Sequence, residues 1–424
     1  MLIHVVRPGE TVYAIARNYG VDPHRLMADN GVPADGSLAV GQTLVLRFPD
    51  TVHAVRPGET LTAIARAYGV SVRSLWRNNP QLLGGSLLAP GQVLVITYHE
   101  EKLGTALANG YAYPFLSPDL LAATAPFLTC LTPFTYGLSR DLHLLPLRDE
   151  ALLTGARAHG ARAVMHLSTY TEEEQFDAGR AEHLLTDPVA QARLIAEIRR
   201  TLEEKGFSGL DVDFEYLPGA LAEAYAAFLS RLRQALRAQG HFLWAALAPK
   251  TRPNQPGTLY EGHDYARVGA ATDAVLLMTY EWGYTYGPPM AVAPLPNVRA
   301  VLDYAVTEIP AEKILLGVPN YGYDWPLPYR QGETRAESLS NEEAVRRAVR
   351  YGVEIQFDES AQAPWYRYTA QDGILHKVWF EDARAQAAKL RLVAEYGFPG
   401  MGYWNIMRPA PQTWLVLSSL YDID

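Results

Sequence analysis

The stretch GLDVDFEY, residues 209–216, places three acidic residues at alternate positions of one predicted strand. Asp211, Asp213 and Glu215 alternate there with leucine, valine and phenylalanine. Because successive side chains of a strand point to opposite faces, the acids share one face and the apolar residues the other. A solvated stripe on an edge strand would need polar neighbours instead. We therefore expect the acids to point into a closed barrel, where shared protons or hydrogen bonds must offset their burial.

Short apolar runs alternate with amphipathic helical stretches on both sides of this strand, from about residue 100 to residue 424. Residues 190–206 and 221–239, for example, repeat apolar positions every three or four residues. The candidate strands are residues 105–113, 127–134, 162–168, 209–216, 242–249, 274–280, 313–319 and 400–404. Eight strand–helix units predict an α/β fold of the (β/α)8 TIM barrel type, with its active site at the carboxyl ends of the strands.

One segment, from about residue 321 to residue 381, interrupts this alternation. It offers a helix over 340–352, followed by short β-like runs on either side of a turn at Asp372-Gly373. We interpret the segment as a small α+β insertion between the seventh strand of the barrel and the helix that follows it.

The amino-terminal part of the chain is an internal repeat. Residues 4–21 read HVVRPGETVYAIARNYGV and residues 53–70 read HAVRPGETLTAIARAYGV. In each copy a short strand leads to a helix that Thr11 or Thr60 can cap, and a second helix and a closing strand follow. The repeat predicts two small βααβ domains, at residues 1–49 and 50–99, before a barrel domain at residues 100–424.

These repeats resemble the LysM family, which binds glycans that contain N-acetylglucosamine. In that family the groove lies between the first strand–helix loop and the second helix–strand loop. The alternative is that the PGET segment is only a turn and a helix cap. Two weak sites on one polymer would strengthen each other through effective concentration. The resemblance implies these groove residues: Gly9, Glu10, Thr11, Asn30 and Gly31 in the first copy, and Gly58, Glu59, Thr60, Asn79 and Pro80 in the second.

The Asp-x-Asp-x-Glu pattern on a barrel strand resembles glycoside hydrolase family 18, the chitinase-like barrels. The resemblance implies that Glu215 is the general acid/base, that Asp213 orients and polarises the N-acetyl group of the substrate, and that Asp211 is its buried partner. The substrate's own carbonyl oxygen then acts as nucleophile in a retaining mechanism. The longer family motif begins with a further aspartate, and this sequence has Ser208 at that position.

Two further segments carry the same resemblance. LLMTYEWG (276–283) is similar to a Met-x-Tyr-Asp motif at the sixth strand, with glutamate in place of the usual aspartate, and GMGYWN (400–405) is similar to the end of the eighth strand. Residues after the first and seventh strands could line the same cleft or could pack in the core. The implied or candidate substrate contacts are Met278, Tyr280, Glu281 and Trp404 from the motifs, and Tyr111, Asn320, Tyr321 and Trp325 from the strand ends.

Composition excludes several other classes of protein. Lys and Arg number 37 against 46 Asp and Glu, and a net charge of −9 argues against binding to nucleic acid or to an anionic membrane surface. Cys130 is the single cysteine, so an internal disulfide and a thiolate metal site are excluded. We recognise no metal-binding motif, no cofactor loop, no membrane-spanning run and no secretion signal, and expect neither a metal nor another cofactor.

The two repeats, the barrel and the lack of a recognisable signal together resemble the spore cortex-lytic and germination enzymes of endospore formers. The resemblance implies an N-acetylglucosaminidase acting on cortex peptidoglycan, located in the spore coat, the cortex or the cell wall. A chitinase or chitooligosaccharide hydrolase would use the same residues and is the nearest alternative. A catalytically silent, lectin-like wall or spore-coat protein is the alternative from another class, but such barrels usually lose the final glutamate, and Glu215 is present.

Overall fold

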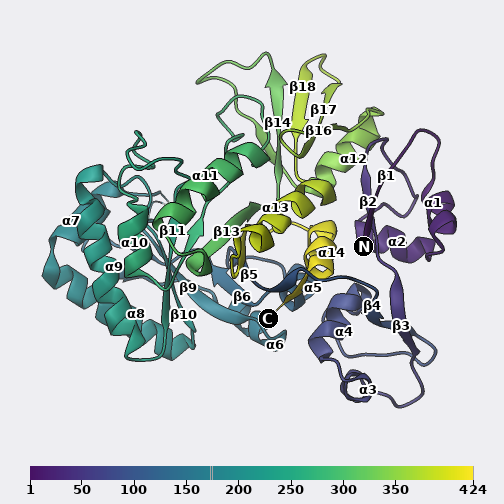
Figure 1. Cartoon of the computed structure of the whole chain (residues 1–424), viewed down its shortest axis with the longest axis horizontal. Helices are drawn as coiled ribbons and strands as arrows, with labels where there is room; N and C mark the ends of the chain where they lie inside the picture. The colour runs from purple at the N-terminus through teal and green to yellow at the C-terminus, as the bar shows by residue number, and fades with distance from the viewer. Residues whose placement is uncertain (172, 174, 424) are drawn as a thin grey trace.

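The computed structural model describes residues 1–171, 173 and 175–423. Figure 1 shows a barrel with a small sheet and its helix standing above the barrel. Two small amino-terminal domains lie to one side of the barrel. The first small domain consists of β1 (Leu2–Val5), α1 (Val12–Tyr19), α2 (Pro23–Asn30) and β2 (Thr43–Leu46). The second consists of β3 (Pro49–Ala54), α3 (Leu61–Tyr68), α4 (Val72–Asn78) and β4 (Val93–Tyr98). In each domain the two strands pair antiparallel.

Local sequence signals explain the shape of both small domains. The Thr11 hydroxyl accepts a hydrogen bond from Ala14 N, and the Thr60 hydroxyl accepts one from Ala63 N, so each threonine caps its helix. Gly20 ends the first helix in the left-handed region at φ +68°, and a second glycine ends α3 in the same way. The predicted strand–helix–helix–strand order is confirmed in both copies.

Eight parallel strands form the barrel, as the sequence predicts. The barrel closes because the last strand pairs with the first, with Gly400 opposite Leu107. The strands are β5 (Gly104–Ala112), β6 (Cys130–Pro133), β9 (Arg162–Ser168), β10 (Gly209–Asp213), β11 (Phe242–Leu247), β12 (Ala274–Leu277), β13 (Ile314–Pro319) and β19 (Gly400–Trp404). Helices outside the barrel include α6 (Glu150–Ala158), α8 (Pro188–Lys205), α9 (Ala222–Arg237), α10 (Tyr265–Ala271), α11 (Leu295–Glu308), α13 (Ala383–Tyr396) and α14 (Pro411–Leu420).

Two of the predicted strands run three residues too far at their carboxyl ends. The fourth barrel strand, β10, ends at Asp213 instead of residue 216, because the carbonyl of Phe214 accepts a hydrogen bond from His263 Nε2 at 2.9 Å rather than from a neighbouring strand. The sixth, β12, ends at Leu277 instead of residue 280. Glu215 therefore lies beyond the strand, on the loop at the open end of the barrel.

The predicted α+β insertion after the seventh strand is confirmed. Its antiparallel sheet has the strand order β15-β14-β18-β17-β16, and its helix begins with a Ser340 cap. The elements are β14 (Gly322–Leu327), β15 (Glu337–Leu339), α12 (Asn341–Tyr351), β16 (Gln356–Asp358), β17 (Ala363–Thr369) and β18 (Leu375–Trp379). In Figure 1 this unit stands above the barrel and next to the first small domain.

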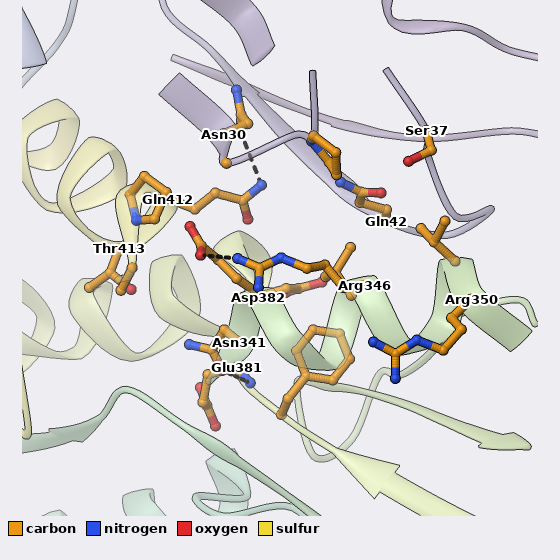
Figure 2. Close-up of a pocket in the computed structure, with 18 of the residues that line it drawn as sticks. Asn30, Ser37, Gln42, Asn341, Arg346, Arg350, Glu381, Asp382, Gln412 and Thr413 are labelled. Carbon is orange, nitrogen blue, oxygen red and sulfur yellow. Dashed lines mark hydrogen bonds and ion pairs between the residues drawn. The ribbon is translucent and has the colours of Figure 1, made fainter. Parts of the chain in front are cut away.

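The first small domain packs against both the insertion and α14. Gln412 Nε2 donates hydrogen bonds to Asn30 Oδ1 at 3.1 Å and to the Thr43 carbonyl at 2.6 Å, as Figure 2 shows for Asn30. Gly41 lies so close to the Ile355 carbonyl that a β-carbon there would stand 1.9 Å from that oxygen. A cavity of about 230 Å³ remains between the three units. The first domain thus packs on the rest of the molecule through both side-chain hydrogen bonds and a close backbone contact.

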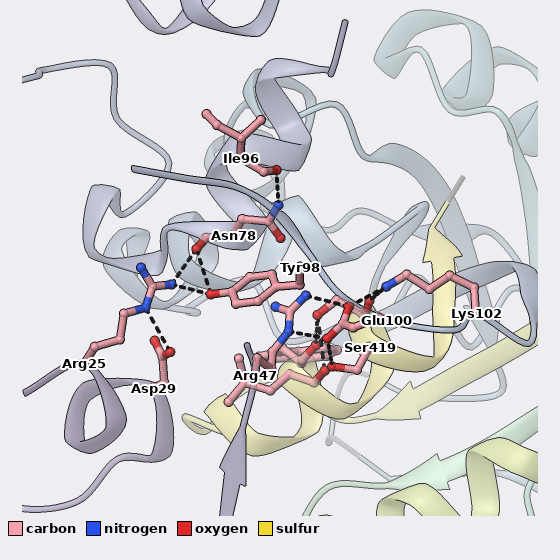
Figure 3. Close-up of polar contacts among 12 residues, drawn as sticks. Arg25, Asp29, Arg47, Asn78, Ile96, Tyr98, Glu100, Lys102 and Ser419 are labelled. Carbon is pink, nitrogen blue, oxygen red and sulfur yellow. Dashed lines mark hydrogen bonds and ion pairs between the residues drawn. The ribbon is translucent and has the colours of Figure 1, made fainter. Parts of the chain in front are cut away.

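The second small domain uses a different face to reach the barrel. Arg73 Nε on α4 donates to the Pro126 carbonyl at 2.9 Å, and the ring of Trp76 lies 5.4 Å from that of His159. Between the domains, the guanidinium of Arg47 makes two hydrogen bonds to Glu100, at 2.7 and 3.0 Å (Figure 3). Within the described residues, we find no helix long and apolar enough to cross a membrane.

Candidate active site

The carboxyl ends of the barrel strands surround a cavity of about 650 Å³. Asp213 and Glu215 line it from the end of β10, Tyr280 lines it from the loop after β12, and Trp404 lines it from the end of β19. This is the position at which TIM barrels carry their active sites. The geometry therefore gathers the sequence motifs of three separate strands around one space.

Asp211 lies below this cavity, fully buried in the barrel interior. The hydroxyl of Tyr111 donates a hydrogen bond to Asp211 Oδ2 at 2.6 Å, and His166 Nε2 lies 4.0 Å from the same oxygen. Burial raises the pKa of Asp211 to about 6, although the bond from Tyr111 lowers it. Among the described residues, Tyr111 is the one close hydrogen-bond donor to Asp211.

Asp213 lies between Asp211 and the cavity. Its Oδ2 is 3.7 Å from His166 Nε2, and its Oδ1 has no hydrogen-bond partner among the described residues. Burial raises the pKa of Asp213 well above its ordinary value, and the negative charges of Glu215 and Asp211 raise it further. An aspartate in this environment is stabilised by a nearby positive charge or by a proton.

Glu215 is half-buried at the floor of the cavity. Burial, together with the negative charge of Glu281, raises the pKa of Glu215 to about 7. Glu281 Oε1 in turn accepts hydrogen bonds from the hydroxyls of Tyr321 at 2.5 Å and Tyr323 at 2.9 Å. A carboxyl group that keeps its proton near neutrality is suited to general acid catalysis.

Two residues at the site have backbone conformations that are unfavourable for their side chains. Tyr216, which follows Glu215, has φ +57°, and Glu281, which follows Tyr280, has φ +67°. The left-handed region costs a residue with a β-carbon about 1–2 kcal/mol. Such strain collects at functional sites, where the surrounding structure holds it. Here it turns the chain sharply after two of the motif residues.

His166 is a site residue that the sequence analysis did not single out. Its Nδ1 lies 2.7 Å from the Thr135 hydroxyl, and its Nε2 lies 3.7 Å from Asp213 Oδ2, on the side of the ring that faces the aspartates. Burial lowers the pKa of His166 to about 3, which keeps the ring neutral. The pairing of His166 with Asp211 in adjacent strands is the signal that could have identified it.

The structure places the remaining cleft candidates in two cavities and in the core. Met278 and Tyr111 line the main cavity, and Asn320 and Tyr321 line a smaller adjoining cavity of about 240 Å³. Trp325 is fully buried and donates its indole N–H to the Gly287 carbonyl, so it packs in the core. Aromatic residues not singled out from the sequence also line the main cavity: Tyr113, Phe134, Tyr170, Phe176, Tyr216, Tyr260, Trp282 and Tyr284.

The candidate groove residues of the small domains differ in exposure. The turns at Gly9–Thr11 and Gly58–Thr60 lie at the surface. Within them Glu10 accepts hydrogen bonds from Arg7 N and His4 Nε2, both at 2.8 Å, and Glu59 has the matching contacts in the second copy. Each turn is therefore closed by its own glutamate.

Asn30 and Asn79, by contrast, are buried. The amide of Asn79 bonds the Leu75 carbonyl and both backbone groups of Val95, and Asn30 makes the equivalent bonds in the first copy. These side chains tie the second helix to the closing strand. Of the loop residues beside them, Gly31 faces Glu342 of α12, and Pro80 is half-buried.

The part of the chain that the structure describes gathers no group of three or more His, Cys, Asp or Glu side chains able to hold a metal ion. Cys130 is buried in strand β6. The polar chemistry of the cleft accordingly consists of carboxyl, hydroxyl, imidazole and indole groups.

Comparison with known proteins agrees with this geometry. The family model of glycosyl hydrolases family 18 matches residues 162–408, and that of the LysM domain matches residues 4–47 and 53–97. The chain is 40% identical to the cortical fragment-lytic enzyme of Bacillus subtilis over 431 aligned residues, which cover 100% of this chain and 99% of the relative. It is 38% identical to the cortical fragment-lytic enzyme of Bacillus anthracis, with 99% and 98% covered.

Solved structures give the same picture. The spore cortex-lytic enzyme SleL of Bacillus cereus superposes with a TM-score of 0.84 at 35% identity, over 100% of this chain and 98% of that one. A chitinase from Chromobacterium violaceum superposes with a TM-score of 0.69 at 26% identity, over 74% and 98%. The full-length similarity and the family match lead to one conclusion: this chain belongs to glycoside hydrolase family 18 and carries two LysM domains ahead of its catalytic barrel.

Proposed function

We propose that this enzyme is an N-acetylglucosaminidase that cleaves the glycan strands of spore cortex peptidoglycan, or fragments of them. The observation that carries the proposal is the column of Asp211, Asp213 and Glu215, which rises from the barrel interior to the floor of an aromatic-lined cleft. The substrate class follows from the two relatives that are named for lysis of cortical fragments and align along the whole chain.

Glu215 supplies the proton in the first step. With a pKa of about 7 it is largely protonated at mildly acidic pH, and it donates that proton to the glycosidic oxygen as the bond to the anomeric carbon breaks. The carbonyl oxygen of the substrate's own acetamido group attacks the anomeric carbon from the other side, which closes an oxazolinium ring. Water then opens the ring, and Glu215 takes a proton back from that water.

Asp213 stabilises the intermediate. The ring closure places positive charge on the acetamido nitrogen, and an ionised Asp213 next to it offsets that charge. Burial makes ionisation of Asp213 costly, so the approach of a positive centre favours its charged form. His166 Nε2 lies 3.7 Å from Asp213 Oδ2, and Tyr280 lines the same cavity as Asp213.

Trp404 gives the cleft a surface on which a sugar ring can stack. Its ring lies 5.9 Å from that of Tyr111 and 5.1 Å from that of Phe134, and it remains half-exposed to the cavity. Sugar rings present apolar C–H faces that pack well on aromatic side chains. Met278, Tyr280 and Glu281 line the same space, and the Tyr280 hydroxyl and the Glu281 carboxylate would contact the acetamido group and the hydroxyls of the substrate.

The two LysM domains bind the same polymer in this proposal. The exposed turns at Gly9–Thr11 and Gly58–Thr60 offer the surface, while Asn30 and Asn79 shape it from within. Residues 1–49, 50–99 and 100–424 then act as two glycan-binding domains and one catalytic domain. The site of action is the spore cortex or the cell wall.

A direct test uses Glu215→Gln and the matched control Glu223→Gln, an exposed carboxylate on α9. Purified cortex fragments and chitin oligomers are incubated with the wild type and both variants, and the new reducing ends are counted. We expect Glu215→Gln to lose a factor of about 10²–10⁴ in rate, as removal of a general acid does, and Glu223→Gln to match the wild type. Equal product from the wild type and Glu215→Gln would refute the catalytic assignment, and cleavage of chitin oligomers alone would favour the chitinase.

A further inference from the structure

The cavity of about 230 Å³ between the first LysM domain, α12 and the start of α14 is separate from the catalytic cleft. In Figure 2, Gln42 comes to it from the LysM domain, and Arg346 and Arg350 come from α12. Among the described residues that line it, none lines the catalytic cleft and none belongs to the exposed turn at Gly9–Thr11. Ligand pockets commonly measure roughly 300–1,000 Å³, so this cavity admits only a short segment of a larger molecule.

Much of the cavity wall is apolar. Val345 and Val349 lie four residues apart, and therefore on the same face of α12, and Phe380 lines the cavity with them. Pro33 and Pro411 add apolar surface from the LysM domain and from α14. A small apolar group, such as a methyl group, would be removed from water by entering here, which favours its binding.

Glu381 gives the cavity a buried hydrogen-bond acceptor. It is 1% exposed, and its Oε2 accepts a hydrogen bond from Lys389 Nζ at 2.7 Å. Its Oε1 has no hydrogen-bond partner among the described residues. Burial raises the pKa of Glu381 to about 7, although the charge of Lys389 lowers it. A buried acceptor without a partner is unfavourable, and an N–H group of a ligand would satisfy it.

Gln42 gives the same cavity a hydrogen-bond donor. It is 5% exposed, and its Oε1 accepts a hydrogen bond from Ala39 N at 3.0 Å. Its Nε2 makes no hydrogen bond within the described part of the chain. An amide group matches this pair of side chains, because its N–H can donate to Glu381 and its carbonyl oxygen can accept from Gln42.

Two arginines of α12 add positive charge at the exposed edge of the cavity. The side chains of Arg346 and Arg350 are 50% and 61% exposed. Arg346 pairs with Glu342 at 2.9 Å, whereas the nearest carboxylate oxygen to Arg350 among the described residues belongs to Glu343, at 3.8 Å. Arg350 can therefore bind the carboxylate of a ligand. The acetamido group of a sugar has a methyl group and an amide but no charge, so the arginines favour an acidic peptide over a sugar.

We propose, on the basis of the function proposed above, that this cavity binds the stem peptide of peptidoglycan at its alanyl-glutamyl amide. The methyl group of the alanine packs on Val345 and Val349, and the amide bonds Glu381 and Gln42. The free α-carboxylate of the D-glutamyl residue lies at Arg350. A glycan strand that still carries its peptides is then held through a peptide as well as through its sugars.

The probe for this site is N-acetyl-L-alanyl-D-glutamine. In the stem the side-chain carboxyl of D-glutamate forms the next amide bond and its α-carboxylate stays free, and D-glutamine reproduces both groups. The comparison ligands are the same peptide with an amidated α-carboxyl and N-acetylglucosamine. Dissociation constants are measured on the full chain by ligand-observed NMR. We expect the wild type to bind the carboxylate form about threefold to tenfold more tightly than the amidated form, and N-acetylglucosamine not to compete with either peptide.

Two variants and two matched controls locate the binding. The variants are Arg350→Ala and Val349→Asp, and the controls are Arg330→Ala on the insertion and Val306→Asp at an exposed position of α11. Arg350→Ala should abolish the preference for the carboxylate form. Val349→Asp should weaken binding of that form about tenfold or more, because the new charge repels it. Both controls should bind like the wild type. Thermal unfolding identifies a folding defect in Val349→Asp, and Arg350→Ala, at an exposed position, then decides the matter.

The site would be overturned if the wild type bound neither peptide, or if Arg350→Ala kept the full preference for the carboxylate form. Competition by N-acetylglucosamine that is lost in Val349→Asp would also overturn it, because the cavity would then hold an acetamido group. Failure of the proposed function is seen in hydrolysis instead. In that case the wild type and Glu215→Gln release equal product from cortex fragments, whatever the peptides bind.

Discussion

The hydroxyl of Tyr111 on β5 donates a 2.6 Å hydrogen bond to Asp211 on β10, and it is the one close donor that the buried carboxylate has among the described residues. This bond lowers the pKa of Asp211 against the effect of burial. It therefore helps the acid column to hold negative charge under Asp213.

Replacement of that hydroxyl should be costly for catalysis. Tyr111→Phe should raise the pKa of Asp211, so that this carboxyl takes up a proton at a higher pH. The acidic limb of the rate profile should therefore move to higher pH. A hydrogen bond to a charged group is worth about 1.5–3 kcal/mol, which corresponds to a shift of about one to two pH units in this limb. The measurement is kcat against pH on a soluble oligosaccharide. Tyr403→Phe, which removes a buried hydroxyl without a hydrogen-bond partner in the described structure, is the control; an unchanged profile in Tyr111→Phe would contradict the role.

The alkaline limb of the profile should respond to Glu281. Glu215 must be protonated to act as an acid, so activity is lost as the pH rises through its pKa of about 7. Glu281→Gln removes a negative charge that raises this pKa, and the alkaline limb of kcat/KM should move to lower pH. Glu333→Gln, at an exposed position of the insertion, should leave the limb in place. If the alkaline limb of Glu281→Gln stays at the same pH or moves to higher pH, a group other than Glu281 controls its position.

The packing of the first LysM domain against the insertion can be tested by replacing either of two glycines with alanine. Gly41 has φ +83° and Gly91, its counterpart in the second domain, has φ +86°, so alanine costs about 1–2 kcal/mol of backbone strain at either position. Only at Gly41 does the new methyl group also meet the Ile355 carbonyl. Urea unfolding should therefore show a larger loss of stability for Gly41→Ala than for Gly91→Ala. Equal losses would mean that the domain is not seated as described.

The ion pair of Arg47 and Glu100 should make stability depend on pH. Arg47, Lys102 and Ser419 together hold the pKa of Glu100 at about 2, although burial opposes them (Figure 3). A lowered carboxyl pKa contributes stability that is present above its ordinary value of 4.5 and is lost as the pH falls toward 2. Glu100→Gln should cost about 3–5 kcal/mol at pH 7, because it leaves the Arg47 charge buried and unpaired.

The loss from Glu100→Gln should shrink as unfolding is measured at decreasing pH below 4.5. Glu101→Gln, an exposed neighbour, is the control and should be neutral at every pH. A deficit that stays constant down to pH 2.5 would rule out the ion pair as its cause.

Signals carried by neighbouring residues made much of this fold predictable. Thr11 and Gly20 mark the two ends of a helix within ten residues, and the same signals recur in the second copy. The alternation of Asp211 and Asp213 with apolar residues indicated a strand that is buried on both faces. Each of these inferences needs only the periodicity of a helix or strand and the chemistry of a cap.

Features that depend on distant partners could not be predicted in this way. The strand β10 ends where it does because Phe214 pairs with His263, 49 residues along the chain. Asn30 reads as a polar loop residue, but the backbone of Val45 and the side chain of Gln412 take up its amide. His166 lies opposite Asp211 in the register of β9 and β10. That register is not visible in a single sequence, so this pair was not predicted.

The way in which the LysM domains are fastened has a consequence for how the enzyme meets an insoluble substrate. Only two residues separate β2 from β3, and each domain rests on the barrel domain through its own contacts. Neither domain is therefore attached to the barrel by a long flexible tether. A glycan strand bound by the proposed LysM surfaces would then be cleaved at a fixed distance from the place where it is held. The spacing of glycan strands in the wall, rather than the length of a linker, would then decide which glycosidic bonds the enzyme can reach.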